Sequence, residues 1–212
     1  MASWQHALVF AIAHEIANQL GAIRLQAHLL DEDLGPRALA EASIEIDGLA
    51  ARAGPLLALL RAILSPAEAI GMPSAEGPHW SALLLGLGRE IEDEGTRGVR
   101  VEIEMPTELQ QQRAPGVNWL HPLLMALVGS TLSVVSRRGS IGLGLESRGS
   151  ETALIVGDDG AQEDLEADAA LRGRPLCVSI ARRLVAGLGG RVEVFRVEHQ
   201  TRVELIFPNA DS

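Results

Sequence analysis

A histidine followed by a carboxylate in a helix-forming segment is the pattern in this sequence best suited to chemistry. The run AHEIANQL, residues 13–20, places His14 and Asn18 four positions apart, so a helix would bring both to one face. A neutral imidazole has one nitrogen lone pair that can act as a nucleophile, and a carboxylate can hold the ring proton on the other nitrogen. Glu15 is about 100° further round the helix and reaches the ring only by bending across. These residues are therefore candidates for a nucleophilic site, although they would also suit an ordinary solvated helix surface.

Two long helices must position these residues. From Ser3 to Leu30 there is no proline, and apolar residues recur at helical spacing at positions 10, 13, 17, 20 and 27. Turn signals at 31–35 precede a second periodic run that starts at Pro36, and Gly54 with Pro55 predicts a kink in it. A hairpin this apolar cannot bury both faces alone. We therefore expect a homodimer in which two hairpins form a four-helix bundle.

The remainder of the chain has a mixed pattern. Residues 65–78 contain three prolines and two glycines and indicate a linker. Helical patterns follow at 80–94, 117–135 and 176–188, and strand patterns at 99–105, 141–146, 152–156, 191–197 and 202–207. This order predicts an α/β sandwich, with helices on one face of a sheet.

Composition excludes several classes of function. The net charge is −10, all 18 basic residues are Arg, and aromatic residues make up only 3%, so a nucleic-acid partner is not expected. The apolar run at 7–13 is too short to cross a bilayer, which argues against a membrane protein. Cys177 is the single cysteine, so no internal disulfide can form and we expect a cytoplasmic location. No residue spacing indicates a metal site.

The order of these segments resembles the catalytic core of bacterial sensor histidine kinases. The His14 run and its hairpin are similar to the family's dimerisation and phosphotransfer hairpin, and the second region resembles its Bergerat-like ATP-binding domain. The helix at 123–141 is similar to the N-box, VGDDG at 156–160 to the D-x-G-x-G box that closes on adenine, and 173–190 to the second glycine-rich box. The resemblance implies a phosphotransfer hairpin at 1–64, a linker at 65–78 and a degenerate ATPase-like domain at 79–212.

The sequence departs from the family where the nucleotide would bind. Ser130 stands at the position of the magnesium-binding Asn, and Ser133 or Val134 where a basic residue is expected. In the glycine-rich box Gly173 is kept, but Pro175 and Cys177 replace two glycines, so a backbone cradle for phosphates is not expected there. Asp158 and Gly160 remain in the adenine-box position, where they would also suit a simple turn. The intervening lid is acidic, with Glu163, Asp164, Glu166 and Asp168.

These observations favour a histidine phosphotransferase of a two-component phosphorelay, a dimer that passes a phosphoryl group through His14 between response-regulator receiver domains. Such a protein needs no nucleotide and no cofactor of its own, because the receiver brings the Mg²⁺. Glu15 would orient the ring, and Asn18 could position a water. Two alternatives stay open: a divergent ATP-dependent sensor kinase core, and a non-catalytic pseudokinase scaffold that binds regulators.

Overall fold

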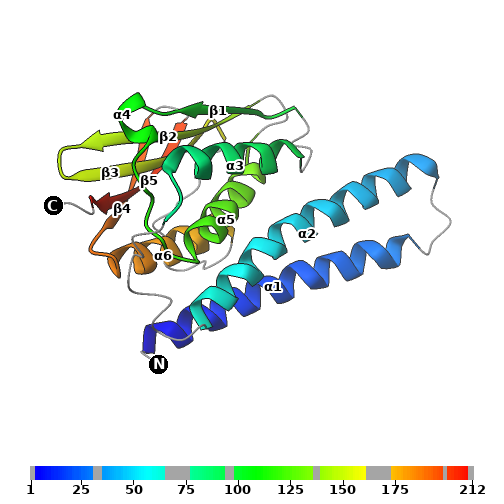
Figure 1. Cartoon of the computed structure of the whole chain (residues 1–212). Helices are drawn as coiled ribbons and strands as arrows, with labels where there is room; N and C mark the ends of the chain where they lie inside the picture. Colours follow the sequence, from blue (N-terminus) through cyan, green and yellow to red (C-terminus); the bar gives the residue numbers. More distant parts are fainter. Residues whose placement is uncertain are drawn as a thin grey trace.

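The amino-terminal part of the protein is a long helical hairpin (Figure 1). The computed structural model describes residues 3–30, 35–64, 77–93, 98–135, 139–160, 173–197 and 200–209. Helix α1 covers Ser3–Leu29 and helix α2 covers Pro36–Leu64. Pro36 occupies the first turn of α2, where a missing amide costs nothing. Helix α2 continues through Gly54 and Pro55 as one element, so the predicted kink does not divide it.

The second part of the protein is a five-stranded sheet with helices on one face (Figure 1). Its elements are α3 (Trp80–Asp93), β1 (Arg100–Glu104), α4 (Thr107–Gln110), α5 (Leu120–Leu132), β2 (Ser140–Arg148), β3 (Glu151–Asp158), α6 (Gly173–Ala186), β4 (Arg191–Val197) and β5 (Gln200–Pro208). The strand order is β1-β2-β3-β5-β4; β1 pairs with β2 in parallel, and the other neighbours are antiparallel. Helices α3, α5 and α6 lie on the inner face, which confirms the predicted fold class.

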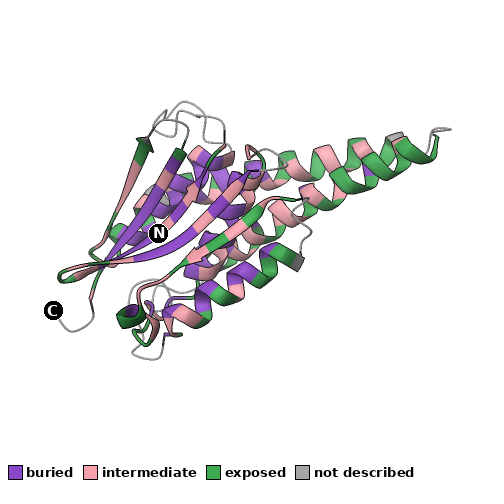
Figure 2. Cartoon of the chain, turned by 90° about the horizontal axis from the view of Figure 1, so that it is seen from above, coloured by how far each residue is buried: buried purple, intermediate pink, exposed green. Residues whose placement is uncertain are grey.

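The sheet and the hairpin share one hydrophobic core. Alternate residues of the central strands, among them Leu143, Val156 and Leu205, point into it and are almost fully buried. The hairpin enters the same core with Ile12 and Leu59, because α2 packs on α5 and α1 contacts α6. The far half of the hairpin projects away from the sheet and is mostly exposed (Figure 2). The linker predicted at 65–78 falls between these parts, and its residues 65–76 lie outside the described ranges, as do the acidic lid residues Glu163, Asp164, Glu166 and Asp168.

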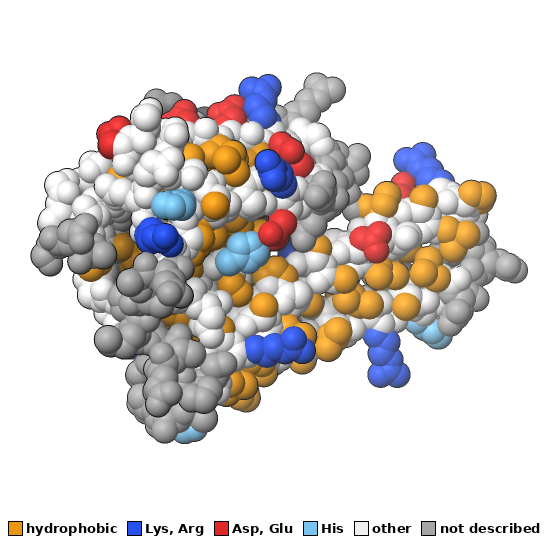
Figure 3. All heavy atoms as spheres, viewed as in Figure 1, with side chains coloured by type: hydrophobic (Ala, Val, Ile, Leu, Met, Phe, Trp, Pro, Cys, Tyr) orange, Lys and Arg blue, Asp and Glu red, His pale blue; other side chains and the backbone are white. Residues whose placement is uncertain are grey.

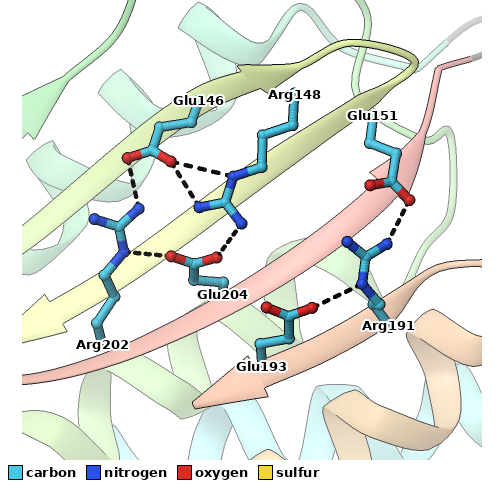
Figure 4. Close-up of polar contacts among 7 residues, drawn as sticks. All are labelled: Glu146, Arg148, Glu151, Arg191, Glu193, Arg202 and Glu204. Carbon is cyan, nitrogen blue, oxygen red and sulfur yellow. Dashed lines mark hydrogen bonds and ion pairs between the residues drawn. The ribbon is translucent and has the colours of Figure 1, made fainter. Parts of the chain in front are cut away.

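Charged side chains form a closed ring over the opposite face of the sheet (Figure 4). Arg148 binds Glu146 at 2.7 Å and Glu204 at 2.6 Å, and Arg202 binds the same two carboxylates, each at 2.5 Å. The Glu204 side chain is almost fully buried between the two guanidinium groups. Hydrogen bonds from Arg148 and Arg202 lower the pKa of Glu146 below its ordinary value. The ring therefore covers the outer face with paired charges instead of a second layer of helices.

Candidate functional site

His14 lies on the solvent-exposed side of α1, as predicted, although positions 10, 13, 17, 20 and 27, which the sequence pattern placed on the apolar face, are exposed as well. The side chains of Leu8 and Ile12 on the same helix are buried, whereas His14 and Asn18 are exposed. The Phe10 ring lies parallel to the imidazole, with the two ring centroids 6.3 Å apart. The imidazole is therefore accessible to a partner and has an aromatic neighbour one turn before it on the helix.

Glu15 does not have the position that the sequence suggested. Its side chain is only 6% exposed, and its Oε1 accepts a hydrogen bond from Gln19 Nε2 at 2.9 Å. Among the described residues, the structure records no bond between Glu15 and His14. The 100° step between consecutive helical residues turns the carboxylate towards the α/β part and leaves the imidazole in solvent. In this arrangement the recorded hydrogen bond of Glu15 is to Gln19 of the same helix, and its carboxylate lies on the side of α1 that faces the α/β part.

A small cavity of about 80 Å³ lies where the hairpin meets the α/β part. It is lined from α1 by Glu15 and Gln19, from α2 by Arg52 and Leu56, from α5 by Ala126 and Ser130 with Ser133 just beyond it, and from α6 by Gly173 and Cys177. Three of the predicted nucleotide-box positions, Ser130, Gly173 and Cys177, are thus adjacent to the residue that follows His14. Side chains of α1 and α2 therefore form the wall of this cavity on the side of the hairpin.

Ser130 and Cys177 both bond to backbone carbonyl groups of α5, although Cys177 itself belongs to α6. Ser130 Oγ donates to the Leu127 carbonyl at 2.8 Å, and Cys177 Sγ donates to the Ala126 carbonyl at 3.5 Å. Burial raises the pKa of the Cys177 thiol to about 12, so it stays protonated at neutral pH. A protonated thiol is a poor ligand for a cation, and a serine hydroxyl is a weak substitute for an amide oxygen.

Asp158, which the sequence analysis placed in the adenine-box position, forms a buried ion pair with Arg174. Arg174 Nη2 donates to Asp158 Oδ2, and the two side chains are 1% and 0% exposed. The other carboxylate oxygen, Oδ1, accepts the Gly160 amide at 2.9 Å. Arg174 Nε and Nη1 are buried without a hydrogen-bond partner. Both carboxylate oxygens of Asp158 are therefore occupied by groups of the protein itself.

The segment that resembles the glycine-rich box is helical, which differs from a flexible phosphate-binding loop. Helix α6 already begins at Gly173, whose φ of 54° lies in the left-handed region, and Pro175 lies within its first turn. Arg174, between them, was not singled out by the sequence analysis. The available signal was a cation inside a glycine-rich box, 16 residues after Asp158. Sequence separation alone does not reveal which of the acidic residues between 158 and 168 it contacts.

Two negative findings apply to the described residues. No group of three or more His, Cys, Asp and Glu side chains among them could hold a metal ion. Within the same ranges, no helix has the length and apolar character needed to cross a membrane.

Solved structures with the same architecture come from histidine kinases. The histidine kinase AdeS of Acinetobacter baumannii matches 93% of this chain and 98% of its own, with a TM-score of 0.63 and 12% identity. The chain has the fold of a histidine kinase catalytic core. Full-length ShkA, solved in complex with AMPPNP, matches 97% of this chain and 46% of its own, with a TM-score of 0.58 and 17% identity.

A structure described as a bacterial phosphotransferase has this kinase-core fold over its whole length as well. It matches 97% of each chain, with a TM-score of 0.51 and 16% identity. Neither a family model nor a curated protein matches the sequence. At these identities the likeness establishes the fold, and the activity has to be argued from the residues.

Proposed function

We propose that this chain is a histidine phosphotransferase, which carries phosphoryl groups on His14 between response-regulator receiver domains and does not use ATP. The observation that carries the proposal is the buried pair of Asp158 and Arg174 in a protein whose hairpin exposes His14. His14 is accessible to a partner protein, whereas the carboxylate in the adenine-box position, Asp158, is bound by Arg174 of the same chain.

The closed nucleotide region supports the loss of ATP chemistry. In the resemblance to histidine kinases, Asp158 is the carboxylate that would receive adenine, but here it binds Arg174 and the Gly160 amide. Because the Asp158 side chain is 0% exposed, a base could reach it only if the groups around the buried ion pair moved apart, and an uncompensated buried charge costs about 3–5 kcal/mol. The helical first turn of α6, with Pro175 inside it, also offers fewer amide donors to phosphates than a glycine loop would.

The chemistry at His14 needs little from the rest of the chain. The lone pair of one imidazole nitrogen forms the N–P bond, the P–O bond to the receiver's aspartate breaks, and the aspartate leaves as a carboxylate. The receiver supplies the Mg²⁺ that neutralises the transferred group. Onward transfer reverses these steps on a second receiver. Glu15 is not needed as a base, and it lies with Leu8 and Ile12 on the buried face of α1, away from the exposed His14.

Exposed apolar side chains along the hairpin support a homodimer (Figure 3). Leu20 is 56% exposed, and Leu39, Ile44 and Leu57 on α2 are exposed as well. Water in contact with this surface costs roughly 25 cal/mol per Å². Leu20 lies about 120° from His14 around the helix, so a seam through Leu20 leaves His14 free. Two hairpins packed through these side chains would form the predicted four-helix bundle.

Transfer from a phosphorylated receiver tests the proposal. Purified protein incubated with a radiolabelled phospho-receiver should gain acid-labile phosphate on His14, and His14→Ala should remove it. His28→Ala is the matched control, because His28 is also exposed on α1 but lies about 21 Å along the helix.

Radiolabelled ATP distinguishes the alternatives. Labelling of His14 by ATP would favour the divergent kinase. Absence of labelling from both donors would favour the scaffold.

A further inference from the structure

Phe10 is the most exposed large hydrophobic residue among those the structure describes. Its side chain is 75% exposed, compared with 61% for Leu25 and 56% for Leu20. An isolated exposed apolar residue needs no explanation, but this one touches the proposed phosphoacceptor. Its ring plane is inclined by only 2° to the imidazole plane of His14, at a centroid distance of 6.3 Å. The combination of exposure and ring contact separates Phe10 from the other exposed apolar residues.

Helix geometry explains why the two rings meet. Residues four apart differ by about 40° around the helix and by about 6 Å along it, so their side chains are neighbours. Helical side chains lean towards the amino terminus, and His14 therefore lies over the turn that carries Phe10. A parallel, offset pair at this centroid distance is within the range of favourable aromatic contacts.

We propose that Phe10 is a positioning residue for His14: its ring restricts rotation of the imidazole and presents the reactive nitrogen to a docking receiver in a fixed direction. This inference rests on the proposed phosphotransfer function. It assigns to Phe10 the orienting role that the sequence suggested for Glu15, whose carboxylate is turned into the cavity. A receiver that brings its aspartate to His14 must also cover the Phe10 ring, so docking would tighten the ring contact by excluding water.

Three substitutions at Phe10 separate ring contact from apolar bulk. Phe10→Ala removes the side chain, Phe10→Leu keeps an apolar side chain without a plane, and Phe10→Trp keeps an aromatic plane. Leu25→Ala is the matched control, because Leu25 is also exposed on α1 and lies within about 20° of His14 around the helix, but about 17 Å along it.

The measurements are the transfer rate from a labelled phospho-receiver and the NMR resonances of the His14 ring protons. Loss of orientation should slow transfer by about threefold to tenfold in Phe10→Ala and Phe10→Leu, with Phe10→Trp and Leu25→Ala close to the unmodified protein. The His14 ring protons should shift in the same two slow variants, since the ring current of Phe10 is lost.

Three results would overturn the inference. The Phe10→Leu variant could transfer phosphate as fast as the wild-type protein, or the His14 resonances could stay unchanged when Phe10 is replaced. In the third result, light scattering would show that the Phe10→Ala protein is a monomer. The last would place Phe10 in the dimer seam instead. If the unmodified protein accepts no phosphate, the proposed function itself fails, whereas the NMR comparison still decides whether the two rings are in contact.

Discussion

Replacement of Arg174 by Met should strongly destabilise the protein. Met fills a similar space but carries no charge. The buried Asp158 carboxylate then loses its ion-pair partner and keeps its recorded hydrogen bond from the Gly160 amide. Because the two side chains are 1% and 0% exposed, water cannot compensate the charge, and the expected loss is about 3–5 kcal/mol of unfolding free energy. Asp158→Asn should lower the unfolding free energy by a similar amount, since it leaves the buried Arg174 guanidinium without a counter-charge. Nε and Nη1 of this group already lack hydrogen-bond partners.

The double variant Asp158→Asn with Arg174→Met tests the cause. With both charges gone, its stability should return to within about 1–2 kcal/mol of the unmodified protein, because a neutral pair leaves no buried charge unpaired. Urea unfolding of the four proteins gives the coupling energy, and Arg183→Met, at an exposed position of the same helix, controls for loss of any arginine. A loss below about 1 kcal/mol for Arg174→Met would refute the reasoning, because that is the scale of a solvated surface pair.

Three further predictions concern the dimer, the ion-pair ring and the thiol. Leu20→Glu should halve the mass measured by light scattering, and an unchanged mass would exclude a seam through Leu20. Because the pKa of Glu146 is lowered in the folded protein, its contribution to stability is present above the ordinary carboxyl value and is lost as the pH falls through the lowered one. Glu146→Gln should cost less than about 1 kcal/mol at pH 7, given a 42% exposed side chain, and the difference should shrink progressively as acid unfolding series are taken below the ordinary carboxyl pKa. The Cys177 thiol should resist alkylation by iodoacetamide at pH 8 until urea unfolds the chain, since it is buried with a pKa raised to about 12; rapid reaction of the native protein would contradict this burial.

The sequence predicted the fold well because its strongest patterns are long. Apolar spacing over more than 25 residues specified each hairpin helix, and strict alternation specified strands such as β1. Helix α4, Thr107–Gln110, was missed because four residues are too few to show a period. Pro55 predicted a kink in the second helix, and the structure keeps α2 as one helical element through this position.

The candidate site could be predicted only in part. Exposure of His14 agrees with the helix pattern, but the face that the pattern marked as apolar, at positions 10, 13, 17, 20 and 27, is exposed as well, and the buried face carries Leu8, Ile12 and Glu15 instead. The burial of Glu15 did not follow from the pattern, because the surface that covers it comes from residues more than 100 positions away, such as Ser130 and Cys177. The pairing of Asp158 with Arg174 is equally non-local. Contacts between distant segments leave no period in the sequence, so these residues required the structure.

The shared core gives the α/β part a role that does not depend on nucleotides. Ile12 of α1 and Leu59 of α2 are fully buried in a core to which α5 and α6 contribute alongside the hairpin itself. Deletion of the α/β part would strip this cover and leave the hairpin with a second apolar side facing water. On the proposed function, changes at the nucleotide-box positions would be tolerated, whereas loss of the whole domain would not. Selection for a folded hairpin would be sufficient to preserve the sheet and its helices.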